Sequence, residues 1–244
     1  MRTVLAVGAH PDDLELACGG SLAAHVAAGD DVHMLVVTGG QNGPGDFEAR
    51  VDEAEAAAAV LGATLHWGGL VDCAVSVDTN TIGVIENVLR AVEPDLIYVH
   101  HPDDTHQDHR AVAAATLSAA RRHPRVMHYQ SPSSIGFVPT LYVDISGHLD
   151  TKMAALECHR TQVEQSAMVE PDVVVATARH YGAMARISFA EGFRATRFVW
   201  DLAEAEPRTD EVAVGTLRAP GASMSGHGFA AATISLPTKE VAKR

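Results

Sequence analysis

Two apolar runs in this sequence end abruptly in clusters of His and Asp. The first run, Thr3 to Ala9, stops at His10-Pro11-Asp12-Asp13, and the second, Leu96 to Val99, leads into a polar stretch at 100–109. Uninterrupted apolar runs are typical of strands buried on both faces of a parallel sheet. Helical patterns follow both clusters, so each cluster lies in the connection between a strand and the next helix.

Strand and helix patterns alternate along the first 150 residues. We expect strands at 3–9, 32–38, 65–67, 95–100, 126–130 and 141–145, and helices at 14–28, 47–61, 79–92 and 108–122. This alternation predicts a Rossmann-like, doubly wound α/β fold: a mostly parallel sheet with right-handed crossovers and helices on both faces. In the strand order 3-2-1-4-5, the first and fourth strands are neighbours at the switch point where such sheets bind ligands.

The later part of the chain has a weaker pattern. We expect helices at 150–165 and 171–184 and a late strand at 193–200. Beyond Asp201 the composition shifts to Pro, Gly, Ser and Ala, so we expect one domain at 1–204 and a C-terminal extension at 205–244, with a short strand at 230–236. A length of 244 residues suits a single α/β domain.

Charge and composition exclude several classes of protein. Lys and Arg number 18 against 31 Asp and Glu, a formal charge of −13, which opposes binding to a nucleic-acid backbone. The 3 Cys are far apart and suggest neither a disulfide framework nor a thiolate metal site. Apolar runs are too short for a signal peptide or a membrane span, so we expect a cytoplasmic protein without a membrane partner. The sequence leaves open whether the chain forms a homo-oligomer.

The two clusters together predict a metal site. His10 and Asp13 are three residues apart across a strand-to-helix turn, and His109 comes from the second cluster. Two imidazoles and one carboxylate can hold a divalent ion such as Zn²⁺ and leave a coordination position for water. Each motif alone is weak evidence for a metal site. A chain with 14 His produces some His-x-x-His pairs by chance, and Asp-Asp after Pro is often a helix cap.

Three further residues lie beside the expected ligands. Asp12, between His10 and Asp13, can reach a metal-bound water and is the candidate general base. His106 lies three residues from His109 and can face the substrate. Asp108 either orients an imidazole or caps the following helix.

These motifs resemble those of the PIG-L/LmbE-like metal-dependent N-deacetylases. Ala9-His10-Pro11-Asp12-Asp13 resembles the first family motif, and His106-Gln107-Asp108-His109 the second. The resemblance extends over about residues 3–200 and includes three further segments: Arg50-Val51-Asp52-Glu53, His159-Arg160-Thr161-Gln162 and Ala190-Glu191-Gly192-Phe193. The chain departs from the family at Gln41, where the family has Glu after Thr-x-Gly, in the loop that the resemblance assigns to the substrate.

The resemblance implies a zinc-dependent hydrolase that removes the acetyl group from a small N-acetylglucosamine-type conjugate. Such an enzyme hydrolyses a C–N bond other than a peptide bond. Fe²⁺ in place of Zn²⁺ stays open. We expect His106, in its protonated form, to stabilise the oxyanion and to be able to donate a proton to the amine. The resemblance favours His106 as the imidazole that Asp108 orients, and it makes Arg50 a substrate-binding residue instead of one half of a solvated ion pair with Glu53. The alternatives are a deacetylase of a non-sugar amide, a non-haem iron oxygenase using the same two His and one carboxylate, and a module that binds a metal or another ligand without catalytic activity.

Overall fold

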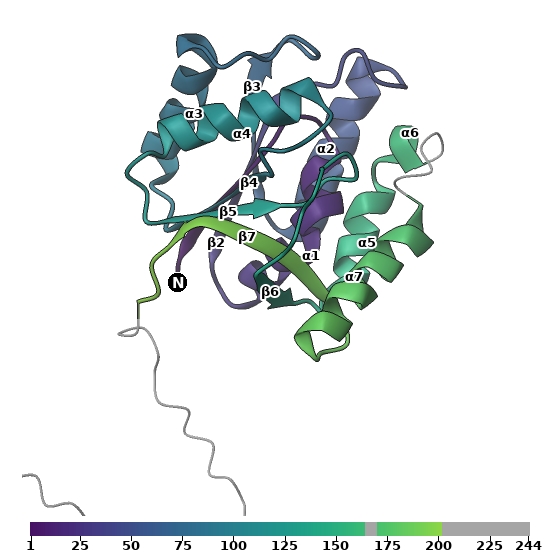
Figure 1. The fold of residues 1–244 in the computed structure, drawn as a ribbon. Coiled ribbons are helices and arrows are strands. Elements are labelled where there is room, and N and C mark those ends of the chain that lie inside the picture. Colours follow the sequence, from purple (N-terminus) through teal and green to yellow (C-terminus); the bar gives the residue numbers. More distant parts are fainter. Residues whose placement is uncertain (164–169, 202–244) are drawn as a thin grey trace, which may run out of the picture. The chain divides into compact units, whose positions relative to one another are not determined.

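The computed structural model describes residues 1–163 and 170–201, of which 1–200 form one compact unit (Figure 1). The extension expected at 205–244, its strand at 230–236 and the end of the helix expected at 150–165 lie outside the described residues.

A seven-stranded sheet with the order β3-β2-β1-β4-β5-β7-β6 forms the centre of the fold. Its strands are β1 (Thr3–Gly8), β2 (Asp31–Thr38), β3 (Thr64–Leu70), β4 (Leu96–His100), β5 (Arg125–Tyr129), β6 (Leu141–Asp144) and β7 (Ala190–Phe198). The first five in this order are parallel, and β7 runs antiparallel to both β5 and β6. The expected order 3-2-1-4-5 and the mostly parallel α/β class are confirmed.

Helices cover both faces of the sheet (Figure 1). They are α1 (Asp13–Ala27), α2 (Phe47–Leu61), α3 (Thr79–Val92), α4 (Gln107–Ala119), α5 (Leu149–Glu157), α6 (Arg160–Val163) and α7 (Pro171–Ala185). One face packs against α1, α2 and α5, and the other against α3 and α4. The short side chains of the Ala-rich α2 allow it to lie close to the sheet, with Ala54, Ala57 and Ala58 buried.

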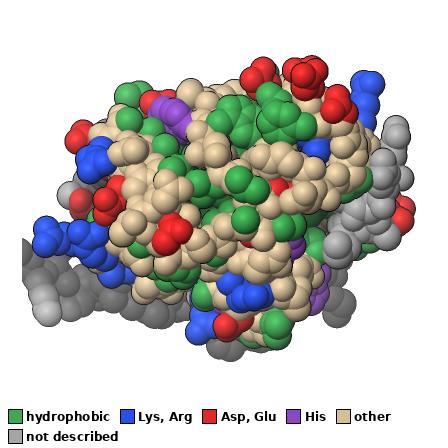
Figure 2. Space-filling model, turned by 90° about the horizontal axis from the view of Figure 1, so that it is seen from above, with side chains coloured by type: hydrophobic (Ala, Val, Ile, Leu, Met, Phe, Trp, Pro, Cys, Tyr) green, Lys and Arg blue, Asp and Glu red, His purple; other side chains and the backbone are tan. Residues whose placement is uncertain are grey.

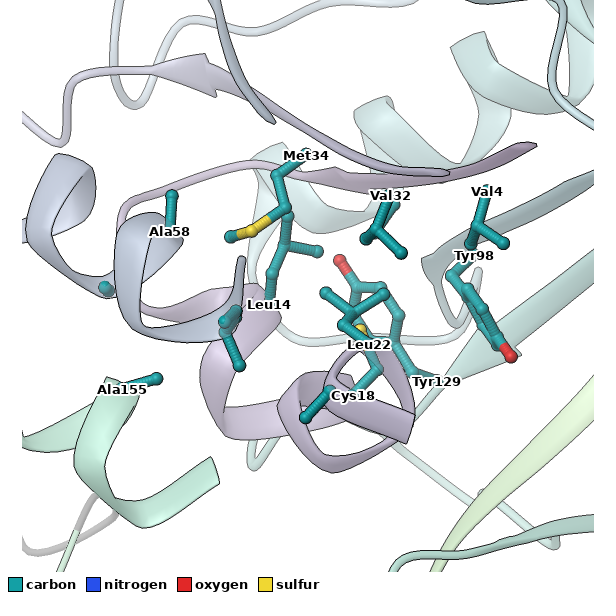
Figure 3. Close-up of a cluster of buried hydrophobic side chains, with 14 of the residues drawn as sticks. Val4, Leu14, Cys18, Leu22, Val32, Met34, Ala58, Tyr98, Tyr129 and Ala155 are labelled. Carbon is teal, nitrogen blue, oxygen red and sulfur yellow. The ribbon is translucent and has the colours of Figure 1, made fainter. Parts of the chain in front are cut away.

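The core on the α1 face shows how the sequence positions the first cluster (Figure 3). Leu14, Cys18 and Leu22 are fully buried on α1 and point towards the sheet. Burying a Leu side chain stabilises the fold by about 1.5–3 kcal/mol. This packing fixes the first turn of α1 directly after β1, and the turn carries the first His/Asp cluster.

One expected element differs from the structure. The helix expected at 150–165 is interrupted at Cys158 and His159, which separate α5 from α6. Sequence periodicity does not reveal such a break, because both flanking segments have helical residues. The break turns His159 into the core, where its side chain is fully buried.

The helices of the described residues, 1–163 and 170–201, include none with the length and apolar character that a membrane span requires.

A buried ion pair fastens α1 to the rest of the domain. The Lys152 ammonium on α5 donates to the Leu16 carbonyl (2.7 Å) and pairs with Glu191 of β7. Glu191 accepts the amides of Gly20 (3.0 Å) and Ser21 (2.7 Å). The Leu16 carbonyl and the Gly20 amide are the groups that a regular helix joins to each other. The two charged side chains therefore bond the backbone in the middle of α1.

Replacing Lys152 tests this anchor. We expect Lys152→Met to lower the free energy of unfolding by about 3–5 kcal/mol, because it leaves the Glu191 carboxylate buried without its cation. Chemical denaturation measures the change. Arg121→Met is the matched control: it breaks the Arg121–Glu86 pair, whose side chains are 64% and 33% exposed, and exposed pairs contribute about 0–1 kcal/mol. Equal losses in the two variants would contradict the anchoring role.

Candidate active site

The two His/Asp clusters meet at the carboxyl ends of β1 and β4, which are adjacent in the sheet. They adjoin a pocket of about 220 Å³ lined by His10, Asp12, Asn42, Gly43, Arg50, Asp72, Cys73, His106 and Gln162. The molecule is viewed from above in Figure 2, where acidic and hydrophobic side chains are interspersed. Lys and Arg of the described residues do not gather into a broad patch on this face.

The Asp13 carboxylate is held by the backbone of the turn that precedes it. Its Oδ2 accepts the amides of His10 (2.7 Å) and Ala9 (3.1 Å). Its Oδ1 lies 3.4 Å from Nε2 of His109. The backbone bonds fix the carboxylate, and Oδ1 is directed to the second cluster.

The two candidate imidazole ligands each direct one nitrogen towards Asp13 and the other to a different carboxylate. Nδ1 of His10 is 3.5 Å from Asp13 Oδ2, while its Nε2 is 3.0 Å from Asp72 and 3.1 Å from Asp108. His109 has Nε2 at Asp13 and Nδ1 3.3 Å from Asp104. Metal-ligating His residues usually have this arrangement, with the far N–H donated to a carboxylate.

These distances suit a divalent ion. Two ligands of one tetrahedral ion, with bonds of about 2.0–2.2 Å, are separated by roughly 3.3–3.6 Å. The contacts of Asp13 with His10 and His109, at 3.5 and 3.4 Å, fall in this range, and they reach different oxygens of the carboxylate, Oδ2 and Oδ1. His10, Asp13 and His109, which the sequence predicted as ligands, are therefore brought together with the donor types that Zn²⁺ binds.

The three predicted ligands do not occur together in any of the sets of donor atoms that lie close to one another in the described part of the chain. Among the described residues, atoms within 4.8 Å of one another come from three sets: His10, His106 and His109; Asp13, His100 and His109; and His10, Asp72 and Asp108. His10, Asp13 and His109 share two members with each of the first two sets. His100 is a poorer ligand, because its Nε2 shares the Ala9 amide with Asp13 Oδ2, at 3.0 and 3.1 Å.

The charges around the cluster favour a cation. Burial opposes a charge on His10, yet the carboxylates of Asp108, Asp13 and Asp72 raise its pKa to about 12. Burial likewise opposes a charge on His109, but Asp13 and Asp104 raise its pKa to about 9. Burial would raise the pKa of Asp13, and the neighbouring imidazoles hold it well below its usual value. The same negative field that favours protonated imidazoles favours a bound divalent ion.

Asp12 has a strained backbone and a perturbed carboxyl group. Its φ of 98° is in the left-handed region, which costs a non-glycine residue about 1–3 kcal/mol and is most common at functional sites. Burial and the nearby Asp13 carboxylate raise the pKa of Asp12 to about 7. A carboxyl group that titrates near neutral pH can accept and return a proton. Asp12 lines the pocket beside His10 and His106.

Asp108 and His106 are arranged differently from the expectation. Asp108 contacts the imidazole of His10, whereas the resemblance favours His106; it also accepts the Cys73 amide (2.7 Å). The N-cap of α4 is His106, whose Nδ1 accepts the Asp108 amide (3.2 Å). Burial and the charges of His10 and His109 lower the pKa of His106. An accepting Nδ1 makes the imidazole neutral, with its proton on Nε2.

Arg50 is buried, with 4% of its surface exposed, and does not form the solvated pair with Glu53. It donates to the carbonyls of Gly40 (2.6 Å) and Pro11 (3.2 Å), while Glu53 accepts from Thr161. Gly40 (φ +64°) and Gly43 make room for the guanidinium, since a Cβ on either would lie within 2.4 Å of Arg50. Arg50 thus ties the glycine-rich loop to the turn that precedes Asp12.

Asp72 and Asp104 are site residues for which the sequence suggested no role. Asp72 follows β3 and accepts the Asn42 amide (2.8 Å) besides contacting His10. Gln41, the departure from the family pattern, accepts the Asp72 amide through its side chain (3.3 Å). The position of Asp72 after a strand end was the available signal, because the carboxyl ends of parallel strands meet at one edge.

Comparisons with known proteins identify the family. Residues 5–120 match the family described as PIG-L: GlcNAc-PI de-N-acetylase. The uncharacterized deacetylase YaiS of Escherichia coli (strain K12) is 34% identical over 170 residues, which cover 66% of this chain and 91% of that protein. The chain belongs to the PIG-L family.

More distant matches differ in activity. The diacetylchitobiose deacetylase of Thermococcus kodakarensis is 25% identical over 221 residues, covering 80% of this chain and 83% of its own. The structure of a 4-carboxy-2-hydroxymuconate hydratase from Pseudomonas putida KT2440 superposes with a TM-score of 0.71 and 24% identity, covering 83% of this chain and all of that one. The second likeness concerns the fold alone.

Metal content tests the ligand set. We expect His109→Ala to lose its divalent ion, because it removes one of three ligands, and elemental analysis after gel filtration measures this. His101→Ala is the matched control. His101 is also buried, at 2% exposure, but its Nδ1 bonds to Asp103 and its ring packs on Phe137. A His109→Ala protein with its metal content unchanged would shift the ligand role to His106.

Proposed function

We propose that this protein is a divalent-metal-dependent hydrolase that removes the N-acetyl group from a small N-acetylglucosamine-type conjugate. The observation that supports this best is the combination of three candidate metal ligands with a separate carboxyl group, Asp12, which lines the pocket beside His10 and His106. A site that only stores a metal has no need of such a group.

His10, Asp13 and His109 would hold the ion. Zn²⁺ suits the two nitrogens and one oxygen, and Fe²⁺ binds the same donor types. A bound divalent ion would lower the pKa of a water molecule to about 7 and polarise the acyl oxygen of the amide. Asp72 and Asp108 orient His10 through its Nε2, at 3.0 and 3.1 Å.

The residues of the chain supply the proton transfers. Asp12 takes a proton from the attacking water, and the water oxygen bonds to the acyl carbon. His106 donates its Nε2–H to the oxygen that becomes negative at this carbon. When the C–N bond breaks, the nitrogen needs a proton. We assign that proton to Asp12, which has just received one, because neutral His106 gives up its only N–H less readily. The products are a free amine and acetate.

The sugar assignment rests on the family and on the pocket. The matching family is described by an N-acetylglucosamine substrate, and one relative is a diacetylchitobiose deacetylase. Asp72, Asn42, Gln162 and Arg50 give the pocket the polar groups that hydroxyls require. We propose that Arg50, which lines the pocket and holds the glycine-rich loop in place, binds the substrate. The group attached to the sugar, in a thiol precursor or a natural product, stays open.

An oxygenase is the alternative that uses the same ligands, because two His and one carboxylate also bind non-haem iron. An oxygenase has no need of a separate carboxyl group such as Asp12 beside the ligands. Asp12 therefore favours hydrolysis, as does the family.

Release of free amine tests the proposed function. The purified chain is incubated with a panel of N-acetylglucosaminides and non-sugar acetamides, with and without chelator and then with added Zn²⁺ or Fe²⁺. We expect chelator-sensitive release from the sugars, restored by the metal. Release confined to the non-sugar amides would contradict the sugar assignment, and none from metal-loaded protein would contradict deacetylation.

Asp12→Asn tests the role of the base in the same assay. We expect its turnover to fall by about 10²–10⁴-fold while its metal content stays at the wild-type value, because Asp12 is not a ligand. Asp52→Asn, on the exposed side of α2, is the control for loss of one carboxylate. Loss of metal from Asp12→Asn would make Asp12 a ligand and overturn its assignment as base.

A further inference from the structure

Asp104 is a buried carboxylate that lies behind a candidate metal ligand. It belongs to the loop between β4 and α4, and its side chain is fully buried. One oxygen, Oδ2, is 3.3 Å from Nδ1 of His109. The second nitrogen of the same ring, Nε2, faces Asp13 at 3.4 Å. The imidazole of His109 is therefore placed between two carboxylates.

The other contacts of Asp104 fix its position. Oδ1 accepts the backbone amide of His106 (2.8 Å), and Oδ2 accepts the hydroxyl of Ser134 (3.1 Å). The Ser133 hydroxyl is the second neighbour of His109 Nδ1, at 3.4 Å. Asp104 thus joins three segments: its own loop, the start of α4 and the loop after β5.

This geometry determines which nitrogen of His109 is free. A carboxylate only accepts hydrogen bonds, so Nδ1 carries the proton when it bonds to Asp104. The lone pair of the neutral ring is then on Nε2, the atom that faces Asp13. In metal sites such a partner fixes both the tautomer and the orientation of the imidazole, and its loss weakens metal binding by about 10–100-fold.

We propose that Asp104 is a positioning residue that orients His109 for metal binding and fixes its tautomer. The inference rests on the ligand set given under the proposed function. It assigns Asp104 to His109, as Asp72 and Asp108 are assigned to His10, so that each imidazole ligand has a carboxylate of its own.

The competing explanation is that Asp104 only ties two loops together. Ser134 separates the two explanations. Its hydroxyl donates to Asp104 and accepts the Ser131 amide (2.9 Å). Ser134→Ala therefore removes two bonds of the loop tie and leaves the contact between Asp104 and His109 in place. Asp104→Asn keeps a carbonyl oxygen that can accept the His106 amide, but it removes the charge beside Nδ1.

The test is a measurement of metal affinity. Full-length wild type, Asp104→Asn and Ser134→Ala are stripped with chelator and titrated with Zn²⁺ against a competing chromophoric chelator. Thermal unfolding of the metal-free proteins shows that each is folded. Co²⁺-loaded samples give absorption spectra that report the ligand geometry. We expect Asp104→Asn to bind Zn²⁺ about 10–100-fold more weakly, with shifted Co²⁺ bands, and Ser134→Ala to stay close to wild type in both.

Each result decides between the explanations. Affinity of Asp104→Asn equal to wild type, or an equal loss in Ser134→Ala, would overturn the positioning role. If Asp104→Asn does not fold, Asp104→Glu replaces it; the longer side chain cannot keep its carboxylate at the same distance from Nδ1, so unchanged affinity would overturn the proposal. Wild type that binds no ion would overturn the proposed ligand set itself, which distinguishes that failure from failure of the Asp104 inference alone.

Discussion

The hydrogen bonds from the backbone to the Asp13 carboxylate are the interaction on which the site depends. The amides of Ala9 and His10 hold one oxygen of Asp13, and the second oxygen faces His109 across the switch point of the sheet. This arrangement requires β1 to end where it does and α1 to begin at once. The buried apolar side chains of α1 and the Lys152–Glu191 pair hold the helix in that place. Packing in the core is thereby coupled to the chemistry of the pocket.

Much of this architecture could be predicted from the sequence. The uninterrupted apolar runs of β1 and β4 indicate buried parallel strands, and alternation with helices leaves few topologies. The strand order then follows, and with it the proximity of His10, Asp13 and His109. This proximity could be predicted because both clusters lie in the segments that follow the ends of two neighbouring strands, β1 and β4, so that position along the chain determines position in space.

The contacts behind these residues could not be predicted in the same way. The imidazole that Asp108 contacts is that of His10, although His106 is only two residues away in sequence. The break before α6 buries His159 beside Glu15, with 3.3 Å between them. Such pairings join residues from loops and helix breaks, where no periodicity applies, and they depend on side-chain packing across distant segments. Arg50 illustrates the same limit: its spacing from Glu53 suggests an ion pair, yet burial directs its guanidinium to two carbonyls.

The central claim is that one divalent ion binds to two imidazoles and one carboxylate at the ends of β1 and β4. X-ray absorption spectroscopy of the zinc-loaded full-length protein tests it most directly. The account predicts a first shell of nitrogen and oxygen only, at about 2.0–2.2 Å, with the outer scattering of two imidazole rings. A sulfur ligand at about 2.3 Å would contradict it, because it would place the thiol of Cys73, which lines the same pocket, in the coordination shell.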